Sequence, residues 1–504
     1  MVARVLNLPL VVILMIIGAL SMYIPAIYAA TGSNWHSARS FFYSGTIFLA
    51  VSAMLGIATF NYAPKREARD QLLTLLSAFT ILPIMLAVPL WDSVQNTSFL
   101  NAYFEMVSSL TTTGATVFDD PARLTGADHL WRALTGWLGG FLIWVAAIAI
   151  LEPLNLGGFE VLGRSGGEST IGGAQSIGIT DARARVRRYA TLLAPVYLGL
   201  TVLLWIGLLL AGDSPLVGIC HAMSTLATSG ISPVGGLSEA SSGFPGEALI
   251  LCFLVFALSR RTFARDTSER GFRRLKADPE LQMGAVFALA VAVLLFLRHW
   301  AGAIEVETAG AAAQGTSALW GGVFMVLSFL TTTGFESVAW EGARNWSGLE
   351  TPGLILLGLA MIGGGVATTA GGVKLLRVYV LYRHAQRELE RLVHPSSVGG
   401  SGRRARYLRR QGAYVAWIFF MLFAMSIAGV MLALAMTGLS FENSLILTIA
   451  ALSTTGPLTI VGEPGLSYAP LADSAKLILM ASMVLGRMET LAIVALLNPG
   501  FWRR

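Results

Sequence analysis

The stretch SSLTTTGATVFDD, Ser108 to Asp120, decides the fold. It follows a short apolar run, and its series of small hydroxyl residues ends in a glycine. Three related stretches occur further along the chain: STLATSGISPVGG from residue 224, SFLTTTGFESVAW from residue 328 and ALSTTGPLTIVGE from residue 451. The four glycines are roughly 100 to 120 residues apart, which is typical of a fourfold repeat of large units rather than of a short solenoid.

The composition indicates a polytopic membrane protein rather than a set of soluble domains. Of the 504 residues, 55% are hydrophobic and 13% are charged, and the mean hydropathy is +0.66. Such values lie far from those of soluble domains. The two cysteines, Cys220 and Cys252, both stand in apolar contexts, so the sequence supports neither a disulfide scaffold nor a cysteine metal site.

Ten apolar segments are long enough for helices that cross a bilayer, which needs about 20 residues per span. The first is longer than the apolar core of a cleaved signal peptide, so we expect a retained helix. The ten segments are residues 7–30, 40–60, 72–91, 129–151, 189–211, 246–260, 282–300, 351–380, 412–437 and 474–497.

Most of the 35 Lys and Arg residues fall on one set of alternating segments between these spans. Because cytoplasmic loops carry the excess of basic residues, both termini are predicted to be cytoplasmic. The net charge of +6 therefore reflects topology, and the sequence does not predict nucleic-acid binding.

The four Thr/Gly motifs fall in loops on the outer side, each after an apolar run too short to cross the membrane. These runs are residues 97–110, 215–226, 317–330 and 441–452. Such runs predict re-entrant half-helices, and irregular backbone at membrane depth is tolerated only inside protein or beside water. The carbonyl end of each half-helix attracts cations, and a glycine permits a positive φ that turns carbonyls toward a common axis. A single Thr-Thr-Gly stretch is ordinary loop composition, whereas four copies favour a cation pore.

A second motif, GGGVATTAGGVK, covers residues 363–374 in the middle of the eighth apolar segment. Its glycines cannot sustain a helix, so this span is predicted to break. A phosphate-binding loop matches poorly, because Val373 separates Gly372 from Lys374. The alternative is close helix packing through small residues.

Arg487 lies within the last apolar segment, where a charge is costly and by default functional. The alternative is an ion pair with a carboxylate of another span. Lys476, near the outer end of the same segment, is expected to extend its amine to the interface.

Together these motifs resemble the Trk/Ktr/HKT superfamily of potassium transporters, most closely its bacterial TrkH-type members. The resemblance covers essentially the whole chain. It implies an all-α integral membrane protein with ten transmembrane helices and four re-entrant pore helices in fourfold pseudo-symmetric helix-pore-helix repeats. The implied units are two leading helices (1–65), pore repeats 1 (66–160) and 2 (180–275), pore repeat 3 with an intramembrane gating loop (276–400), and pore repeat 4 (401–504).

The resemblance also implies potassium uptake across the bacterial inner membrane, with no catalytic residues. The implied potassium-binding filter comprises Thr112, Thr113, Gly114, Thr228, Ser229, Gly230, Thr332, Thr333, Gly334, Thr454, Thr455 and Gly456. The implied gate comprises Gly363, Gly364, Gly365, Thr368, Thr369, Gly371, Gly372, Lys374 and Arg487. Apart from potassium, no cofactor is expected on this chain, because it lacks a dinucleotide-binding pattern. Nucleotide is expected only on a cytosolic regulatory ring of partner subunits, and homodimerisation and lipid contacts are further expectations.

The fourth motif departs from the family pattern. Leu458 stands where many relatives carry a glycine, and Pro457 restricts Gly456, so this quarter of the filter is expected to differ in shape. The strength of potassium over sodium selection is therefore open. The main rival is a sodium-permeable or ion-coupled (symport) transporter of the same architecture. An enzyme finds little support, since the histidines are dispersed, and a non-conducting scaffold would have no use for four Thr/Gly loops.

Overall fold

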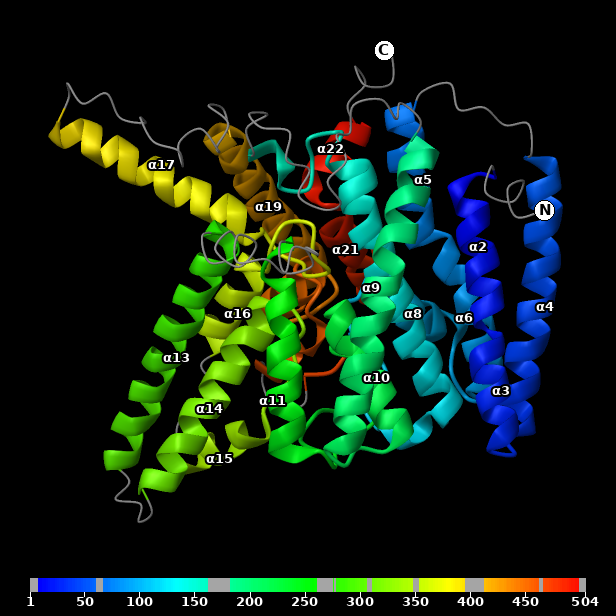
Figure 1. Cartoon of the computed structure of the whole chain (residues 1–504), viewed down its shortest axis with the longest axis horizontal. Coiled ribbons are helices and arrows are strands. Elements are labelled where there is room, and N and C mark those ends of the chain that lie inside the picture. Colours follow the sequence, from blue (N-terminus) through cyan, green and yellow to red (C-terminus); the bar gives the residue numbers. More distant parts are fainter. Residues whose placement is uncertain are drawn as a thin grey trace.

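The computed structural model describes residues 8–59, 67–161, 182–260, 275, 278–305, 311–347, 353–394, 412–461 and 466–497. Every regular element in these ranges is helical (Figure 1). The α-helices are α2 (Leu10–Ser21), α3 (Tyr23–Thr31), α4 (Trp35–Ala58), α5 (Glu67–Thr80), α6 (Leu82–Ser93), α7 (Phe99–Leu110), α8 (Gly126–Ala146), α9 (Ala182–Leu210), α10 (Pro215–Ala227), α11 (Gly243–Leu254), α13 (Pro279–Glu305), α14 (Ala311–Leu330), α15 (Val338–Ser347), α16 (Gly353–Ile362), α17 (Leu375–Val393), α19 (Gly412–Ala435), α20 (Phe441–Leu452), α21 (Asp473–Met488) and α22 (Thr490–Leu497).

Seven helices in these ranges are long and apolar enough to cross a membrane. The other three predicted spans are shorter or interrupted. Residues 246–260 form α11 and a 3₁₀ turn, residues 351–380 form α16 and α17 with an irregular segment between them, and residues 474–497 form α21 and α22. The last break corrects the expectation of one continuous span. It occurs at Glu489, whose φ of 66° is incompatible with a right-handed helix.

The four short apolar runs form helices α7, α10, α14 and α20. Three of these begin at a serine whose hydroxyl accepts a hydrogen bond from the backbone N–H three residues later. The donors and acceptors are Asn101 N to Ser98 Oγ (3.2 Å), Val217 N to Ser214 Oγ (3.5 Å) and Asn443 N to Ser440 Oγ (3.3 Å). A serine cap satisfies an otherwise unpaired helix N–H, so the starts of α7, α10 and α20 are stabilised by the serine side chains.

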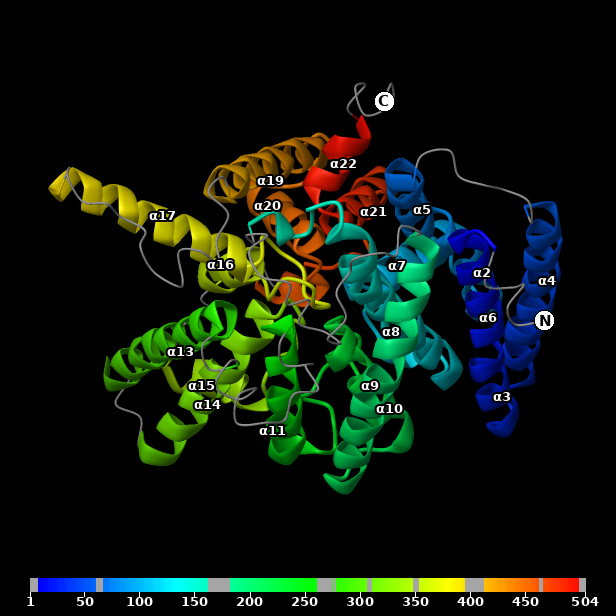
Figure 2. The ribbon, with the colours of Figure 1, turned by 45° about the horizontal axis from the view of Figure 1, so that its top comes forward.

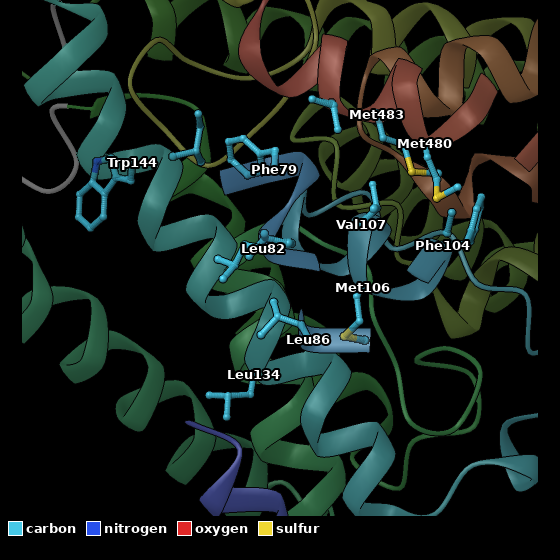
Figure 3. Close-up of a cluster of buried hydrophobic side chains, with 14 of the residues drawn as sticks. Phe79, Leu82, Leu86, Phe104, Met106, Val107, Leu134, Trp144, Met480 and Met483 are labelled. Atoms are coloured by element: carbon cyan, nitrogen blue, oxygen red, sulfur yellow. The ribbon is translucent and has the colours of Figure 1, made fainter. Parts of the chain in front are cut away.

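The first short helix, α7, lies in the middle of the largest buried cluster. Figure 3 shows Phe104, Met106 and Val107 of α7 among side chains from α5, α6, α8 and α21, with Met480 and Met483 approaching from α21. Phe104 and Met106 are fully buried. This packing joins α7 to α21, although the two helices are separated by most of the chain.

The segments that follow the four short helices lie against one another. In Figure 2, helices surround the irregular yellow segment near the centre of the molecule. Helix α17 projects outward from the rest of the molecule (Figure 1). The fold thus places the four Thr/Gly motifs near one another and leaves one amphipathic helix extended.

Candidate ion-permeation site

The four Thr/Gly motifs share one backbone pattern just after their short helices. In each, the residue before the glycine donates its N–H to the carbonyl five residues earlier. The bonds are Thr113 N to Ser108 O (2.8 Å), Ser229 N to Ser224 O (2.9 Å), Thr333 N to Ser328 O (2.9 Å) and Thr455 N to Ala450 O (2.8 Å). The sequence repeat is therefore also a repeat of local structure.

A left-handed residue lies two positions before each glycine. The φ values are 56° at Thr112, 51° at Thr228, 58° at Thr332 and 55° at Thr454. Threonine is β-branched, and positive φ is uncommon for such residues, so the surrounding structure must hold this conformation. The sequence predicts positive φ at the glycines alone, and nothing in the residue types indicates it at the threonines.

The four glycine segments touch one another in a closed ring. A Cβ added to Gly114 would overlap the carbonyl oxygen of Ser229, and one added to Gly230 would overlap that of Thr333. A Cβ on Gly334 would lie 3.1 Å from carbons of Pro457, and one on Gly456 would overlap the backbone of Ala115. Repeats 1, 2, 3 and 4 thus meet in order, and the fourth returns to the first.

All four glycines line one cavity of about 880 Å³. Carboxylates of Asp119, Glu336 and Glu442 line the same cavity, as does the guanidinium of Arg132. We call this cavity, which the four glycines share with three carboxylates, the vestibule. The negative charge of the carboxylates raises the local concentration of cations.

The fourth segment differs in shape from the other three. Gly114, Gly230 and Gly334 have φ values of 73°, 66° and 79°, whereas Gly456 is absent from the left-handed region and begins a 3₁₀ turn, Gly456–Val461. The Gly456 N–H donates to the carbonyl of Thr113 (2.6 Å), and the Gly456 carbonyl accepts from the hydroxyl of Tyr468 (2.9 Å). The expected irregularity next to Pro457 is thus present in the backbone.

Tyr468 is a site residue that the sequence did not reveal. Its side chain is buried, its ring lies 5.7 Å from that of Phe104, and it stands 12 residues after Gly456 in the sequence. Burial raises the pKa of the phenol, so the hydroxyl remains a protonated donor at every physiological pH. Tyr468 therefore fixes the direction of one carbonyl in the ring.

Tyr468→Phe is expected to lower the preference for potassium over sodium by about fivefold, because losing one hydrogen bond worth about 1 kcal/mol frees the Gly456 carbonyl. The permeability ratio measured in liposomes checks this, with Tyr43→Phe on the exposed face of α4 as the control. An unchanged ratio in both variants would show that this bond does not shape the ring.

Polar side chains brace the segments that follow the first two glycines. Glu105 accepts hydrogen bonds from Thr116 Oγ1 and Val117 N (both 2.6 Å) and pairs with Arg132 (2.8 Å). In the second repeat, His221 and Ser232 occupy the same positions as Glu105 and Thr116, and His221 Nε2 lies 2.9 Å from Ser232 Oγ. Helices α7 and α10 thus each hold the segment that follows their own glycine.

The Gly-rich motif forms an irregular segment between Ile362 and Leu375, as predicted. Its ends are close together, since Val373 N donates to Met361 O and Lys374 N donates to Ile362 O (both 2.9 Å). Within it, Gly363 and Gly372 have positive φ, Gly364 O accepts from Leu375 N (2.9 Å), and Thr368 Oγ1 donates to Gly365 O (2.8 Å). The segment is therefore a closed loop with internal hydrogen bonds.

The loop lies directly against the Thr/Gly segments of three repeats. Gly371 N donates to Thr332 Oγ1 (2.8 Å), and Thr369 Oγ1 donates to Leu226 O at the end of α10 (3.0 Å). A Cβ on Gly371 would overlap the carbonyl oxygen of Ser453. Only the family resemblance implied that this loop lies next to the Thr/Gly segments. The structure shows the hydrogen bonds and close contacts between them.

Two of the left-handed threonines carry buried hydroxyls with no hydrogen-bond partner among the described residues. These are Thr112 Oγ1 and Thr454 Oγ1, whereas Thr332 Oγ1 accepts from the loop. Buried hydroxyls are nearly always paired. Two such hydroxyls beside the ring of glycines are consistent with oxygen atoms that face a cation or its water.

Arg487 lies beside the loop and is buried. Its Nη1 donates to the carbonyl oxygen of Thr369 (2.7 Å), whereas Nε and Nη2 have no hydrogen-bond partner in the described part of the chain. Within that part it forms no ion pair, so the alternative of a partner carboxylate on another span finds no support. The guanidinium group of Arg487 therefore contacts the loop through its hydrogen bond to Thr369 O.

Lys374 and Arg377 lie where the loop joins α17. Lys374 Nζ donates to the carbonyl of Ala370, and Lys374 is left-handed with φ 84°. Arg377 is fully buried, pairs with Glu160 and Glu489 (both 2.6 Å), and lies 3.6 Å from the centroid of the Phe419 ring. The sequence did not reveal this cluster, because Arg377 lies more than a hundred residues from either carboxylate.

The outer end of α21 corrects one prediction. Lys476 does not extend to the interface: it is 4% exposed, and its Nζ donates to Asn101 Oδ1 (3.0 Å) and to Ala469 O (3.1 Å). The amine instead links α21 to the start of α7. A buried amine with two acceptors is a structural tie rather than a surface charge.

Known proteins match this chain over nearly its whole length. Residues 37–238 and 280–499 match the family model TrkH, described as cation transport protein. The chain is 32% identical to the Trk system potassium uptake protein TrkI of Halomonas elongata, over 99% of this chain and 96% of that protein. It is 30% identical to the Trk system potassium uptake protein TrkH of Escherichia coli K12, over 97% of this chain and 98% of that protein.

A solved structure agrees with the sequence matches. The crystal structure of the potassium transporter TrkH from Vibrio parahaemolyticus superposes with a TM-score of 0.80 at 27% identity and covers 100% of both chains. The helices, the Thr/Gly ring and these matches lead to one conclusion: the chain is a multi-pass membrane protein that belongs to the TrkH family of cation transport proteins.

Proposed function

We propose that this chain takes up potassium through a channel-like pore whose selectivity filter is made of backbone carbonyls. The observation that carries the proposal is the closed ring of Gly114, Gly230, Gly334 and Gly456, all four of which line the vestibule. Carbonyl oxygens around an axis replace the hydration shell of an alkali cation. The residues before the glycines, from Thr112, Thr228, Thr332 and Thr454 onward, supply the remaining carbonyls and hydroxyls.

In this proposal the architecture comprises ten transmembrane helices and four re-entrant pore helices, arranged as fourfold pseudo-symmetric repeats. Helices α7, α10, α14 and α20 are the pore helices, and the repeats are residues 66–160, 180–275, 276–400 and 401–504 after two leading helices in 1–65. The matching serine caps and backbone bonds support the repeat. Both termini face the cytoplasm of a bacterial inner membrane, as the distribution of basic residues favours.

The Gly-rich loop is the gate of this pore. Its residues Thr369 and Gly371 contact three filter segments, so in this position it lies on the path of an ion that leaves the filter. Gly363, Gly364, Gly365 and Gly372 give it the backbone freedom to move aside. Thr368, Lys374 and Arg487 hold it in the position described here.

Arg487→Ala is expected to raise the basal potassium flux about tenfold, because it removes a buried charge and the hydrogen bond to Thr369 O that holds the loop. Arg487→Lys retains the charge and is the matched control, with a smaller increase. Flux is measured by purified protein in liposomes at equal protein density. A normally folded Arg487→Ala protein with unchanged flux would contradict a gating role.

Opening is proposed to depend on partners. A cytosolic ring of nucleotide-binding subunits would act on α17, which projects outward and exposes Leu389, Leu392 and Val393 near its end. Helix α17 begins where the gate loop ends, and Arg377 in its first turn links it to the break at Glu489. A displacement of α17 by the partner would therefore also displace the end of the loop. A homodimer completes the proposed assembly.

A sodium-permeable or ion-coupled transporter is the second candidate. It is favoured by the fourth filter segment, in which Gly456 is not left-handed and begins a 3₁₀ turn. An irregular quarter offers fewer well-placed carbonyls and weakens discrimination between alkali cations.

Cation uptake by purified protein in liposomes tests the proposed function. Potassium and rubidium are expected to enter at similar rates, and sodium at least about tenfold more slowly, because sodium replaces its hydration shell poorly in a carbonyl ring sized for potassium. Equal rates for all three ions would favour the second candidate. No flux above empty liposomes, in the Arg487→Ala protein as well, would contradict transport by this chain alone.

A further inference from the structure

A second cavity lies away from the vestibule, between helices α2, α5, α8 and α9. Its volume is about 360 Å³, and most of its lining is aliphatic, including Leu14, Leu82, Leu138 and Val145. Helices α2, α5 and α9 all begin at the same end of the molecule, at the top of Figure 1. We call the end of the cavity beside the starts of these helices its mouth, and its interior is apolar.

Charged and polar residues are concentrated at the mouth of this cavity. Arg183 and Arg187 of α9 line it there, together with Asp70 and Gln71 of α5. The Gln71 Oε1 atom is buried and has no hydrogen-bond partner in the part of the chain that the structure describes. The mouth therefore offers guanidinium groups for an anion and acceptors for a hydroxyl donor.

The depth of the cavity suits one acyl chain. On α8 and the turn after it, the lining runs from Ile150, near the mouth, to Thr135. At 1.5 Å per residue this is about 22 Å, whereas one leaflet of the hydrocarbon core is about 15 Å thick. Leu110, the last residue of α7, also lines the cavity. The cavity therefore extends from the membrane surface to the back of the first Thr/Gly segment.

From these features we propose that the cavity binds one phospholipid with an anionic, hydroxylated headgroup, of the phosphatidylglycerol type. The phosphate lies against Arg183 and Arg187, a headgroup hydroxyl donates to Gln71 Oε1, and one acyl chain fills the aliphatic interior. Asp70 at the mouth accepts from a second headgroup hydroxyl and disfavours a lipid whose only polar group is phosphate. The residues that line this site include none of the four glycines of the ring and none of the gate loop.

An acyl chain in this cavity would also support the pore helices. Phe141 lines the cavity, and its ring stacks on Tyr197 at a centroid distance of 5.5 Å. A Cβ on Gly140 would lie 2.9 Å from Tyr197 Oη and 2.9 Å from Cα of Ala227, the last residue of α10. The lipid thus packs against Leu110 of α7 and against α8, which approaches the end of α10 at Gly140.

Two adjacent arginines provide a matched test. Arg187 lines the cavity, whereas Arg188 is likewise exposed on the same helix and does not line it. The full-length protein is incubated with equimolar phosphatidylglycerol and phosphatidylcholine of identical acyl chains, and retained lipid is identified by native mass spectrometry. We expect preferential retention of one phosphatidylglycerol, a loss of about fivefold in Arg187→Gln and no change in Arg188→Gln.

A cavity-filling variant keeps the proposal testable if the charge variant folds poorly. Thr74→Trp places an indole inside the cavity and is expected to abolish lipid retention, while Leu203→Trp on the exposed face of α9 leaves it intact. Equal losses in Arg187→Gln and Arg188→Gln would indicate only general surface attraction and overturn the proposal. Equal retention of both lipids by the unchanged protein, or full retention by Thr74→Trp, would overturn it as well.

Discussion

Gly114→Ser is expected to abolish potassium flux, with a loss of at least about 100-fold, equivalent to about 2.7 kcal/mol in the barrier. Gly114 has a φ of 73°, which a residue with a Cβ rarely adopts, and its new Cβ would overlap the carbonyl oxygen of Ser229. Relief of that overlap moves Ser229, and with it a second segment of the ring. Potassium uptake in liposomes measures the effect.

Gly199→Ser is the matched control for this substitution. Gly199 lies in α9 and is exposed, and a Cβ added there would meet no heavy atom within 4 Å. The same change of residue type is therefore expected to leave flux unchanged at this position. Normal flux through a correctly folded Gly114→Ser protein would mean that ions pass without help from this ring.

Deleting residues 364–372 is expected to raise basal potassium flux at least about tenfold, because the loop lies against Thr332, Ser453 and Leu226 at the exit of the ring. The deletion leaves a short gap to close. A Cβ on Gly363 would lie 2.8 Å from Cα of Gly372, so Gly363 can join Val373 with little movement of α16 or α17.

The selectivity of the shortened protein separates the gate from the filter. Since the deleted residues lie outside the ring of glycines, the ratio of potassium to sodium flux is expected to stay within about twofold of the original value. Gly358→Ala in α16, where an added Cβ has open space, controls for altered packing of that helix. Unchanged or reduced basal flux in a stable deletion protein would leave only a packing role for the loop.

Much of the fold follows from patterns that the sequence states directly. The runs before Gly114, Gly230 and Gly456 form α7, α10 and α20 within two residues of the predicted bounds. The run before Gly334 forms α14, which begins six residues earlier than predicted, at Ala311. Glycine content also predicts the interruption between α16 and α17, since each glycine costs about 1 kcal/mol in a helix. These are local effects, which a single sequence reports well.

Features that depend on distant parts of the chain could not be predicted. Glu489 breaks the last span, and its carboxylate pairs with Arg377, more than a hundred residues earlier. Lys476 is buried because Asn101 of α7 accepts from it. Tyr468 matters only because its hydroxyl donates to the carbonyl of Gly456. In each case tertiary contacts decide the outcome, and the residue type alone carries no signal.

The serine caps are a local sequence signal for the starts of three short helices. Ser98, Ser214 and Ser440 stand at the same place before three of the short apolar runs. These three serines indicate the starts of three helices, since serine is strongly preferred at this position. The left-handed threonines have no such signal, because threonine is among the residues least expected there.

Anomalous diffraction from crystals of the full-length protein soaked in rubidium tests the central claim most directly. The account predicts anomalous density on the axis enclosed by Gly114, Gly230, Gly334 and Gly456, at distances that match coordination by backbone carbonyls. Rubidium density confined to the carboxylates of Asp119, Glu336 and Glu442 in the vestibule, with none inside the ring, would contradict it.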